Sequence, residues 1–186
     1  MIETERLRLR AWLDGDRALF HDINSDPEVM AFFAVRRSRE EADAMMDRLN
    51  ETIARTGRGW FAVAEKESDV ALGMCGLADA NLTPLFPADM VEIGWRLARP
   101  FWGKGYVTET ALALLRLGFE DFGLPEIVSF AVPENDRSLA VMQRLGFRPD
   151  PTRDFDHPRV PDTHPALKRH VFHAMTARHW AERQSG

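Results

Sequence analysis

The pattern of apolar and polar residues changes period in the middle of the chain. Between Val91 and Leu97 apolar residues alternate with polar residues or glycine, which is typical of a β-strand with one buried face. Pro100 follows and ends the strand, because proline cannot donate a hydrogen bond within a sheet. From Val107 to Phe122 apolar residues recur at helical spacing. This stretch therefore predicts a strand, a short turn with two glycines, and a long helix.

Shorter apolar patterns predict the other elements of an α/β protein. Helices are expected over residues 18–24, 27–33, 38–55 and 135–145, and strands over 7–12, 60–65, 70–80, 127–132 and 168–178. Ser38 and Glu41 are spaced as a capping box, and Gly146 stands where a helix often ends in a left-handed residue. Gly73 and Gly76 interrupt a strand pattern, which indicates a bulge or a close backbone contact. No repeat, linker or low-complexity tract divides the chain, so a single domain over residues 1–186 is expected.

Composition narrows the class of protein. The chain has 186 residues, 45% of them hydrophobic, which suits a globular domain with a sizeable core. A formal net charge of −5 argues against a nucleic-acid partner, because nucleic-acid binders carry a basic surface. No apolar run is long enough to span a membrane, and the N-terminus has no secretory apolar segment. A cytoplasmic protein without a membrane partner is therefore expected.

Cysteine and histidine give no support for a metal site. Cys75 is the single cysteine, which excludes an internal disulfide and a cysteine-based zinc site, and its apolar neighbours indicate a small core residue. Five of the six histidines follow residue 156, but their spacing matches no known ligand pattern. We therefore expect no metal, and we expect these histidines to be exposed in a long loop and the last strand.

The turn between the central strand and its helix is a candidate anion site. Gly103 and Gly105 leave backbone amides uncovered by side chains, at the point where the positive end of a helix dipole begins. Such a helix N-terminus binds anions, most often phosphate, whereas the alternative is a turn whose glycines serve only its backbone geometry. Lys104 falls between the glycines, so the Walker A pattern is absent. Thr108 stands where a dinucleotide fingerprint has glycine or alanine.

Three segments together resemble the GNAT N-acetyltransferases. Residues 99–109, RPFWGKGYVTE, are similar to the loop with which this family binds the pyrophosphate of acetyl-CoA. Residues 135–147, NDRSLAVMQRLGF, resemble the family's Asn-x-x-Ser/Ala segment that ends in Gly-Phe. Residues 4–10, TERLRLR, resemble the first strand of the branch that includes ribosomal-protein N-terminal acetyltransferases. The first position of the loop pattern is Pro100 rather than arginine or glutamine, with Arg99 one residue earlier.

The resemblance implies a fold and a cosubstrate. The expected GNAT fold is a mixed, mostly antiparallel twisted sheet of about six or seven strands with about four helices, splayed between its two central strands. The cosubstrate is acetyl-CoA, whose thioester carbonyl would be polarised by backbone amides of the central strand. The residues expected to bind it are Ile93, Trp95, Leu97, Trp102, Gly103, Lys104, Gly105, Tyr106, Asn135 and Ser138.

Glu92 and Ser138 are the candidate catalytic residues within this resemblance. Glu92 lies in the central strand, where related enzymes use an acid, directly or through water, to deprotonate the amine; the alternative is an outward-facing strand residue with no catalytic task. Ser138 is the candidate proton donor to the departing thiolate, because Met142 stands where many members carry a tyrosine. The alternative for Asn135 and Ser138 is helix capping. Cys75 precedes these motifs in an apolar strand, which argues against a covalent enzyme intermediate.

The function implied is direct transfer of an acetyl group from acetyl-CoA to a primary amine. The acceptor is expected to be a protein N-terminus or a small-molecule amine. The residues proposed to contact the acceptor are Phe32, Phe33, Phe86, His157 and His170. The alternative is a non-catalytic acyl-CoA-binding or sensor module, which the missing tyrosine supports. The sequence leaves open the identity of the acceptor, the acyl-chain preference, and the choice between a monomer and a homodimer.

Overall fold

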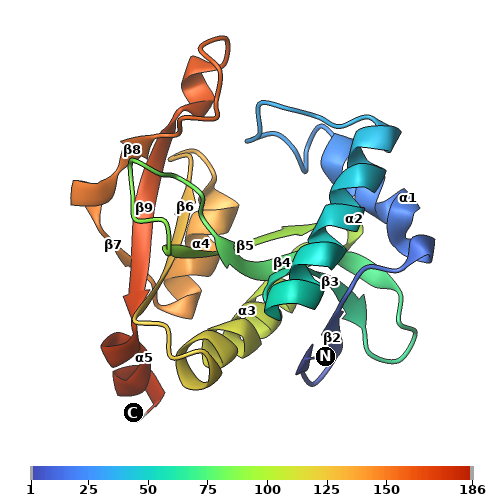
Figure 1. Cartoon of the computed structure of the whole chain (residues 1–186), viewed down its shortest axis with the longest axis horizontal. Helices are drawn as coiled ribbons and strands as arrows, with labels where there is room; N and C mark the ends of the chain where they lie inside the picture. The colour runs from blue at the N-terminus through green and yellow to red at the C-terminus, as the bar shows by residue number, and fades with distance from the viewer. Residues whose placement is uncertain (1, 185–186) are drawn as a thin grey trace. The chain divides into compact units, whose positions relative to one another are not determined.

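The protein is described by a computed structural model that covers residues 2–184 and divides into two compact units. The first unit contains the chain up to Ala78 together with Gly94–Ala113, and the second contains Asp79–Ile93 together with the chain from Leu114 onward. Strand β5, Val91–Leu97, and helix α3, Tyr106–Arg116, contribute residues to both units. Figure 1 labels strands β2 to β9 and helices α1 to α5. The expectation of a single domain over residues 1–186 stays a prediction.

The first unit pairs consecutive strands and packs helices against them. The pairs β1–β2, β2–β3 and β3–β4 are antiparallel. A Cβ added to Gly76 would lie 2.0 Å from the carbonyl oxygen of Gly59, so the predicted close backbone contact is confirmed. The β3–β4 register also shifts between Val63 and Ala64, as at a bulge. The elements are β1, Ile2–Glu3; β2, Leu7–Arg10; α1, Arg17–Ser25; α2, Arg39–Thr56; β3, Gly59–Glu65; and β4, Ala71–Asp79.

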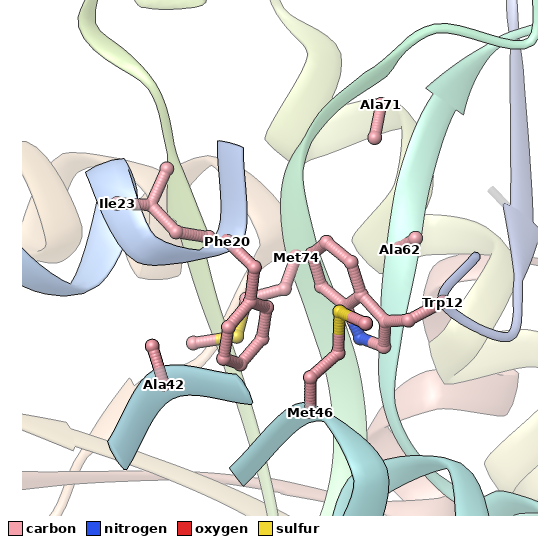
Figure 2. Close-up of a cluster of buried hydrophobic side chains, with 8 residues drawn as sticks. All are labelled: Trp12, Phe20, Ile23, Ala42, Met46, Ala62, Ala71 and Met74. Carbon is pink, nitrogen blue, oxygen red and sulfur yellow. The ribbon is translucent and has the colours of Figure 1, made fainter. Parts of the chain in front are cut away.

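The core of the first unit joins α1 and α2 to strands β3 and β4 (Figure 2). Phe20 and Ile23 come from α1, Met46 from α2 and Met74 from β4, and all of them are buried. The rings of Trp12 and Phe20 meet edge to face, with their centroids 4.7 Å apart. Burial of one large apolar side chain contributes about 1.5–3 kcal/mol. This cluster therefore supplies much of the free energy that holds the two helices on the sheet.

Local hydrogen bonds decide where α2 begins and where a predicted helix is missing. Ser38 Oγ accepts a hydrogen bond from Glu41 N at 3.2 Å, and the Glu41 carboxylate accepts one from Ser38 N at 2.9 Å, so the predicted capping box is confirmed. The helix predicted over residues 27–33 is wrong, because the structure has turns there. The Asp26 carboxylate accepts hydrogen bonds from the amides of Glu28 and Val29 at 2.8 and 3.0 Å. These are the bonds of a helix N-cap, and Met30 N also donates to Asp26 O at 2.9 Å as in a first helical turn. The turn does not continue as an α-helix, because Ala31 N and Phe33 N donate to carbonyls three residues back, Glu28 O at 3.4 Å and Met30 O at 3.0 Å.

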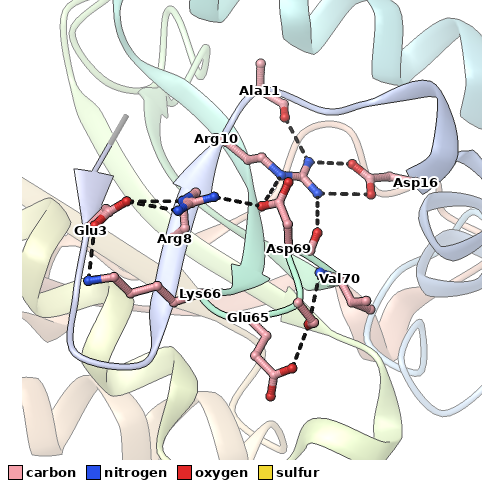
Figure 3. Close-up of polar contacts among 10 residues, drawn as sticks. Glu3, Arg8, Arg10, Ala11, Asp16, Glu65, Lys66, Asp69 and Val70 are labelled. Atoms are coloured by element: carbon pink, nitrogen blue, oxygen red, sulfur yellow. Dashed lines mark hydrogen bonds and ion pairs between the residues drawn. The ribbon is translucent and has the colours of Figure 1, made fainter.

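A chain of ion pairs crosses strand β2 in the first unit (Figure 3). The Arg10 side chain is only 7% exposed, and its Nη1 lies 2.6 Å from Asp16 Oδ2. Arg10 Nε also lies 3.0 Å from Asp69 Oδ1. Arg8 continues the chain, with Nη1 at 3.4 Å from Asp69 and Nη2 at 3.2 Å from Glu3. Because two carboxylates compensate the buried Arg10 guanidinium, the loss of either one would leave part of its charge unbalanced.

The variant Asp16→Asn is expected to lower the free energy of unfolding by about 3 kcal/mol, because it removes the more buried of the two anions that face Arg10. Urea denaturation followed by circular dichroism measures this loss. Asp14→Asn is the matched control: Asp14 is 91% exposed, pairs with Arg17 at 2.9 Å, and should lose less than about 1 kcal/mol. Equal losses in the two variants would contradict the assignment.

The second unit is built around strand β9. Its neighbour β6 runs antiparallel to it, with Phe130 opposite Phe172. Strands β7 and β8 also pair with β9 in the antiparallel sense, whereas β5 and β6 are parallel, with Glu92 opposite Val128. The mixed, mostly antiparallel sheet that the sequence predicts is therefore confirmed. The elements are β6, Glu126–Ala131; α4, Asp136–Leu145; β7, Arg148–Pro149; β8, Phe155–Asp156; β9, Arg169–Thr176; and α5, Ala177–Gln184.

The helices of the second unit both confirm and correct the sequence analysis. Gly146 ends α4 with a φ of +90°, the left-handed conformation that was predicted. The strand expected over residues 168–178 stops at Thr176, and the sequence analysis did not predict α5, in which Trp180 stacks on Phe119 at 5.7 Å between ring centroids. The long helix expected to reach Phe122 ends its regular α-helical part at Arg116 and continues as a π-helical turn, Leu117–Asp121.

Candidate active site

Strand β5 ends directly before the candidate anion loop. Val91, Ile93 and Leu97 are at most 4% exposed, as the alternating pattern predicts, whereas Trp95 is only partly buried. A short 3₁₀ turn over Arg99–Phe101 follows the strand. The Trp102 indole Nε1 then donates a hydrogen bond to Leu97 O at 2.8 Å. This bond turns the chain back on the end of β5, so the loop begins at a defined position.

Gly103 and Gly105 give the loop the backbone shape that the sequence predicts. Their φ angles are +73° and +79°, in the left-handed region that favours glycine. Both residues are exposed, and a Cβ built on Gly103 would meet nothing within 4 Å. Helix α3 starts at Tyr106, and the first amides of a helix lack an acceptor within it. The loop therefore presents N–H groups together with the positive end of the α3 dipole.

Glu109 braces this loop from within α3. Its carboxylate accepts hydrogen bonds from Arg6 N at 2.9 Å, Arg6 Nε at 2.7 Å and Thr4 Oγ1 at 2.5 Å. Arg6 Nη1 in turn donates to Lys104 O at 3.2 Å, and the guanidinium lies 4.8 Å from the Tyr106 ring centroid. Burial raises the pKa of Glu109, but the hydrogen bonds from Thr4 and Arg6 outweigh burial and lower the pKa below its usual value. This brace was not predicted from the sequence, although its members lie in two of the segments that carry the resemblance.

The basic side chains near the loop differ in whether a carboxylate of the protein already neutralises their charge. Lys104 is exposed, and its Nζ lies 5.5 Å from the Phe101 ring centroid. Arg99 Nη1 is paired with Glu28 Oε1 at 2.7 Å. The amide of Trp102 already donates to Arg99 O at 3.1 Å, so a bound anion would have to share this donor with Arg99 O. Lys104 is therefore the cation that the loop itself offers to a ligand.

Glu92 belongs to the second unit and has a partly buried carboxyl group. Burial raises its pKa to about 8, and the positive charge of Arg159 opposes this rise only in part. Arg159 Nη2 donates a hydrogen bond to Ala80 O at 3.4 Å. A carboxyl group with such a pKa binds and releases a proton near neutral pH, which suits a general base. This is not the behaviour of a fully solvated strand glutamate.

The N-terminus of α4 has the capping geometry that the sequence allows. Asn135 Oδ1 accepts a hydrogen bond from Ser138 N at 3.2 Å. Met142, at the position where many family members carry a tyrosine, is 1% exposed and packs in the core. The capping interpretation of Asn135 is thus confirmed, and contacts of Asn135 and Ser138 with a cosubstrate stay a prediction.

The residues expected to contact an acceptor lie in both units. Phe32 and Phe33 belong to the first unit, where Phe32 is partly buried and Phe33 is 46% exposed. Phe86 belongs to the second unit, and its ring centroid lies 5.1 Å from that of Phe155 in an edge-to-face contact. Phe86 is therefore part of an aromatic cluster rather than a solvated loop residue. Contact of any of these residues with an acceptor stays a prediction.

The expectation of exposed histidines is wrong for most of the late ones. Within the described residues His164 is exposed, and the other late histidines are partly buried. The rings of His157 and His170 lie 4.9 Å apart beside Phe155, because β8 pairs with β9 and brings these residues together. Burial, assisted by His170 and Arg159, lowers the pKa of His157 to about 4. Burial likewise lowers the pKa of His170.

A family model described as an acetyltransferase (GNAT) domain matches residues 6–148 of the chain. The matched stretch contains the loop glycines Gly103 and Gly105, both ends of the Arg6–Glu109 brace, and Glu92. The chain belongs to the GNAT acetyltransferase family. The GNAT family uses acetyl-CoA, so this protein is an acyltransferase that carries out acetyl-CoA-dependent acetylation.

Known proteins agree with this GNAT assignment. The FsC-acetyl coenzyme A-N(2)-transacetylase of Aspergillus fumigatus is 32% identical over 152 residues, which cover 78% of this chain and 63% of that protein. An acetyltransferase (GNAT family) of Bacillus anthracis has the same fold, with a TM-score of 0.78, 23% identity, and coverage of 95% of this chain and 98% of that chain. A spermidine N-acetyltransferase of Vibrio cholerae, solved with CoA and spermine, matches with a TM-score of 0.71, 18% identity, and the same coverage of 95% and 98%.

The loop of this GNAT chain suits the pyrophosphate of acetyl-CoA. A phosphate can approach the backbone at Gly103 because no Cβ covers it and the space around it is open. The hydrogen bond from Arg6 to Lys104 O engages a carbonyl of the loop that would otherwise face an approaching anion without a partner. Within residues 2–184 no group of His, Cys, Asp and Glu side chains could hold a metal ion, and no helix is long and apolar enough to cross a membrane.

Cys75 is expected to be unreactive in the folded GNAT protein. It lies in β4 with no exposed surface, and burial raises its pKa to about 12, although hydrogen bonding to Thr110 acts in the opposite direction. Because the thiolate is the reactive form, iodoacetamide should modify Cys75 at least about 100-fold more slowly in the native protein than in guanidinium chloride. Mass spectrometry of the alkylated protein measures this ratio. Rapid native alkylation with loss of acetyl transfer would instead point to a catalytic thiol.

Proposed function

We propose that this GNAT enzyme transfers the acetyl group of acetyl-CoA directly to a primary amine, either a protein N-terminus or a small-molecule amine. The observation that carries the proposal is the exposed loop at Gly103 and Gly105, which opens α3 and is braced by Arg6 and Glu109. A pyrophosphate is the part of acetyl-CoA that such a helix N-terminus recognises. The names of the Aspergillus and Vibrio proteins, which both describe transfer to nitrogen, support an amine acceptor.

Acetyl-CoA supplies an acetyl group activated as a thioester, and separate parts of the chain are proposed to hold it. The loop amides from Gly103 to Tyr106 are assigned to the pyrophosphate, with Lys104 adding positive charge and Trp102 flanking them. The backbone of β5 is assigned to the pantetheine arm and to the thioester carbonyl, as donors of the oxyanion-hole type. The cap of α4 is assigned to the pantetheine amides. The β5 and α4 residues concerned are Ile93, Trp95, Leu97, Asn135 and Ser138.

Two side chains are proposed to move protons. The Glu92 carboxylate would accept a proton from the incoming ammonium or amine, which its pKa of about 8 allows near neutral pH. Ser138 Oγ would relay a proton from solvent to the departing sulfur, taking one proton up as it gives one away, because Met142 leaves no phenol at the usual position. The buried Met142 is also the observation that favours the second candidate, a non-catalytic acyl-CoA sensor.

A titration followed by an amine screen tests the proposed function. Acetyl-CoA is first titrated calorimetrically into the wild-type protein, and CoA release is then followed with a thiol reagent in the presence of peptides, polyamines and amino acids. Binding followed by amine-dependent release supports the enzyme and identifies the acceptor class. Binding without release on any amine favours the sensor. Absence of binding contradicts both.

A further inference from the structure

Arg96 lies on β5. One side of its guanidinium group donates a hydrogen bond to the protein, and the other side has no acceptor among the described residues. Its Nη1 donates a hydrogen bond to Asn24 Oδ1 at 2.7 Å, and the guanidinium lies 4.2 Å from the Phe33 ring centroid. Its Nε is buried and has no hydrogen-bond partner within residues 2–184. Nη2 likewise makes no hydrogen bond in that part of the chain. All these groups belong to the first unit.

Arg10, the buried arginine of the first unit, shows what the partly buried Arg96 lacks. Arg10 is compensated by Asp16 at 2.6 Å and by Asp69 at 3.0 Å. Arg96 forms no ion pair with a carboxylate among the described residues. A buried N–H donor without an acceptor is unfavourable, and in Arg96 this donor belongs to a charged group with no anion beside it. The contrast between the two arginines indicates a binding role for Arg96.

Asn24 holds the guanidinium in a fixed orientation. The residue has no exposed surface, and its Nδ2 donates to Phe20 O at 2.7 Å, so its Oδ1 is the atom left to face Arg96. Asn24 O also accepts a hydrogen bond from Arg37 N at 3.0 Å, which fixes the segment after α1. Burial, followed by the charge of Arg37, lowers the pKa of Arg96 to about 10, so Arg96 remains charged at neutral pH. The site is therefore preorganised and positive.

We propose that the Nε–Nη2 edge of Arg96 binds a carboxylate of the acceptor, so that the acceptor is an amine that also carries a carboxylate, such as an α-amino acid. Two parallel N–H groups in one plane match the two oxygens of a carboxylate. Phe33 covers one face of the guanidinium, and the Nε–Nη2 edge is the edge that has no acceptor among the described residues. This inference rests on the proposed acetyl transfer and specifies the substrate class for it.

The test compares matched amines on matched variants. The common α-amino acids, their primary amides, and the corresponding amines without a carboxyl group are assayed as acceptors by CoA release. In the wild type, kcat/KM should fall about 10- to 100-fold when the best amino acid is converted to its amide, because the buried N–H groups are then left without their anion. In Arg96→Met this ratio should approach 1, and in Arg96→Lys it should be intermediate. Arg48→Met, which replaces an exposed arginine of α2, should keep the wild-type ratio.

Direct binding separates failure of this inference from failure of the proposed function. The same amino acids and amides are titrated into wild type and Arg96→Met in the presence of CoA, a measurement that needs no turnover. Carboxylate-dependent binding that is lost in Arg96→Met, with an unchanged circular dichroism spectrum, supports the site even if no acetyl transfer is found. Equal binding and equal kcat/KM for acids and amides in the wild type overturn the inference, although acetyl transfer to amines then still stands. Tighter binding of inorganic phosphate than of any carboxylate overturns it as well.

Discussion

Replacing Glu92 with glutamine is expected to lower kcat for amine acetylation by at least about 100-fold, because glutamine keeps the shape of glutamate but cannot accept a proton. The affinity for acetyl-CoA should be unchanged, because Glu92 is not among the residues proposed to bind the cosubstrate. Release of CoA under saturating acetyl-CoA and acceptor measures kcat. Glu67→Gln, at an exposed turn residue, is the control and should retain wild-type turnover. Wild-type turnover in Glu92→Gln would show that another group deprotonates the amine.

The pH profile gives a second view of the same residue. A base must be ionised, so the wild-type rate should rise as pH passes through the pKa of Glu92 at about 8. This rise should be absent from the residual activity of Glu92→Gln.

The contribution of Glu92 to stability should change with pH in the opposite direction and fall as pH rises. Because the folded pKa lies above the ordinary value of 4.5, ionised Glu92 destabilises the fold at high pH. Glu92→Gln should therefore be about 2–4 kcal/mol more stable than wild type at pH values above about 9, and nearly equal to it below about pH 4.

The double variant Gly103→Glu, Gly105→Glu is expected to weaken acetyl-CoA binding by at least about 100-fold, because it places two carboxylates where the loop presents its amides to a pyrophosphate. Both positions also have left-handed φ angles that a side chain strains. Calorimetric titration of acetyl-CoA measures the loss.

A control for this variant must carry strain and negative charge of the same kind at another place. Gly123→Glu adds one carboxylate at one left-handed position, because Gly123 has a φ of +61° and nothing lies within 4 Å of an added Cβ. It should bind acetyl-CoA as the wild type does. If the double variant kept wild-type affinity, the loop would not be the pyrophosphate site; if Gly123→Glu also lost binding, a general effect of strain or charge would explain the result.

Features that depend on neighbouring residues were predictable from the sequence. The capping box of Ser38 and Glu41 and the left-handed Gly146 require only local hydrogen bonds and local dihedral preferences, and both are present. The glycine loop belongs to the same class, since its shape follows from Gly103 and Gly105 and from the start of a helix. The identity of the cosubstrate, acetyl-CoA, came from the resemblance to GNAT enzymes and not from the shape of the loop.

Features that depend on distant residues were not predictable. The late histidines are partly buried because β8 and β9 pair, and no local pattern fixes that pairing. The state of Arg96 depends on Asn24, which lies 72 positions away. Burial and charge balance of this kind become visible only in three dimensions.

The brace between Arg6 and Glu109 has a consequence for how the protein is made. These residues are 103 positions apart, so Arg6 leaves the ribosome well before its partner exists. At a synthesis rate of about 5–20 residues per second, the delay is roughly 5–20 s. Contacts between residues so far apart along the chain form late in folding. A nascent chain can therefore complete its first strands early, but it acquires the braced loop, to which we assign pyrophosphate binding, only after α3 has been translated.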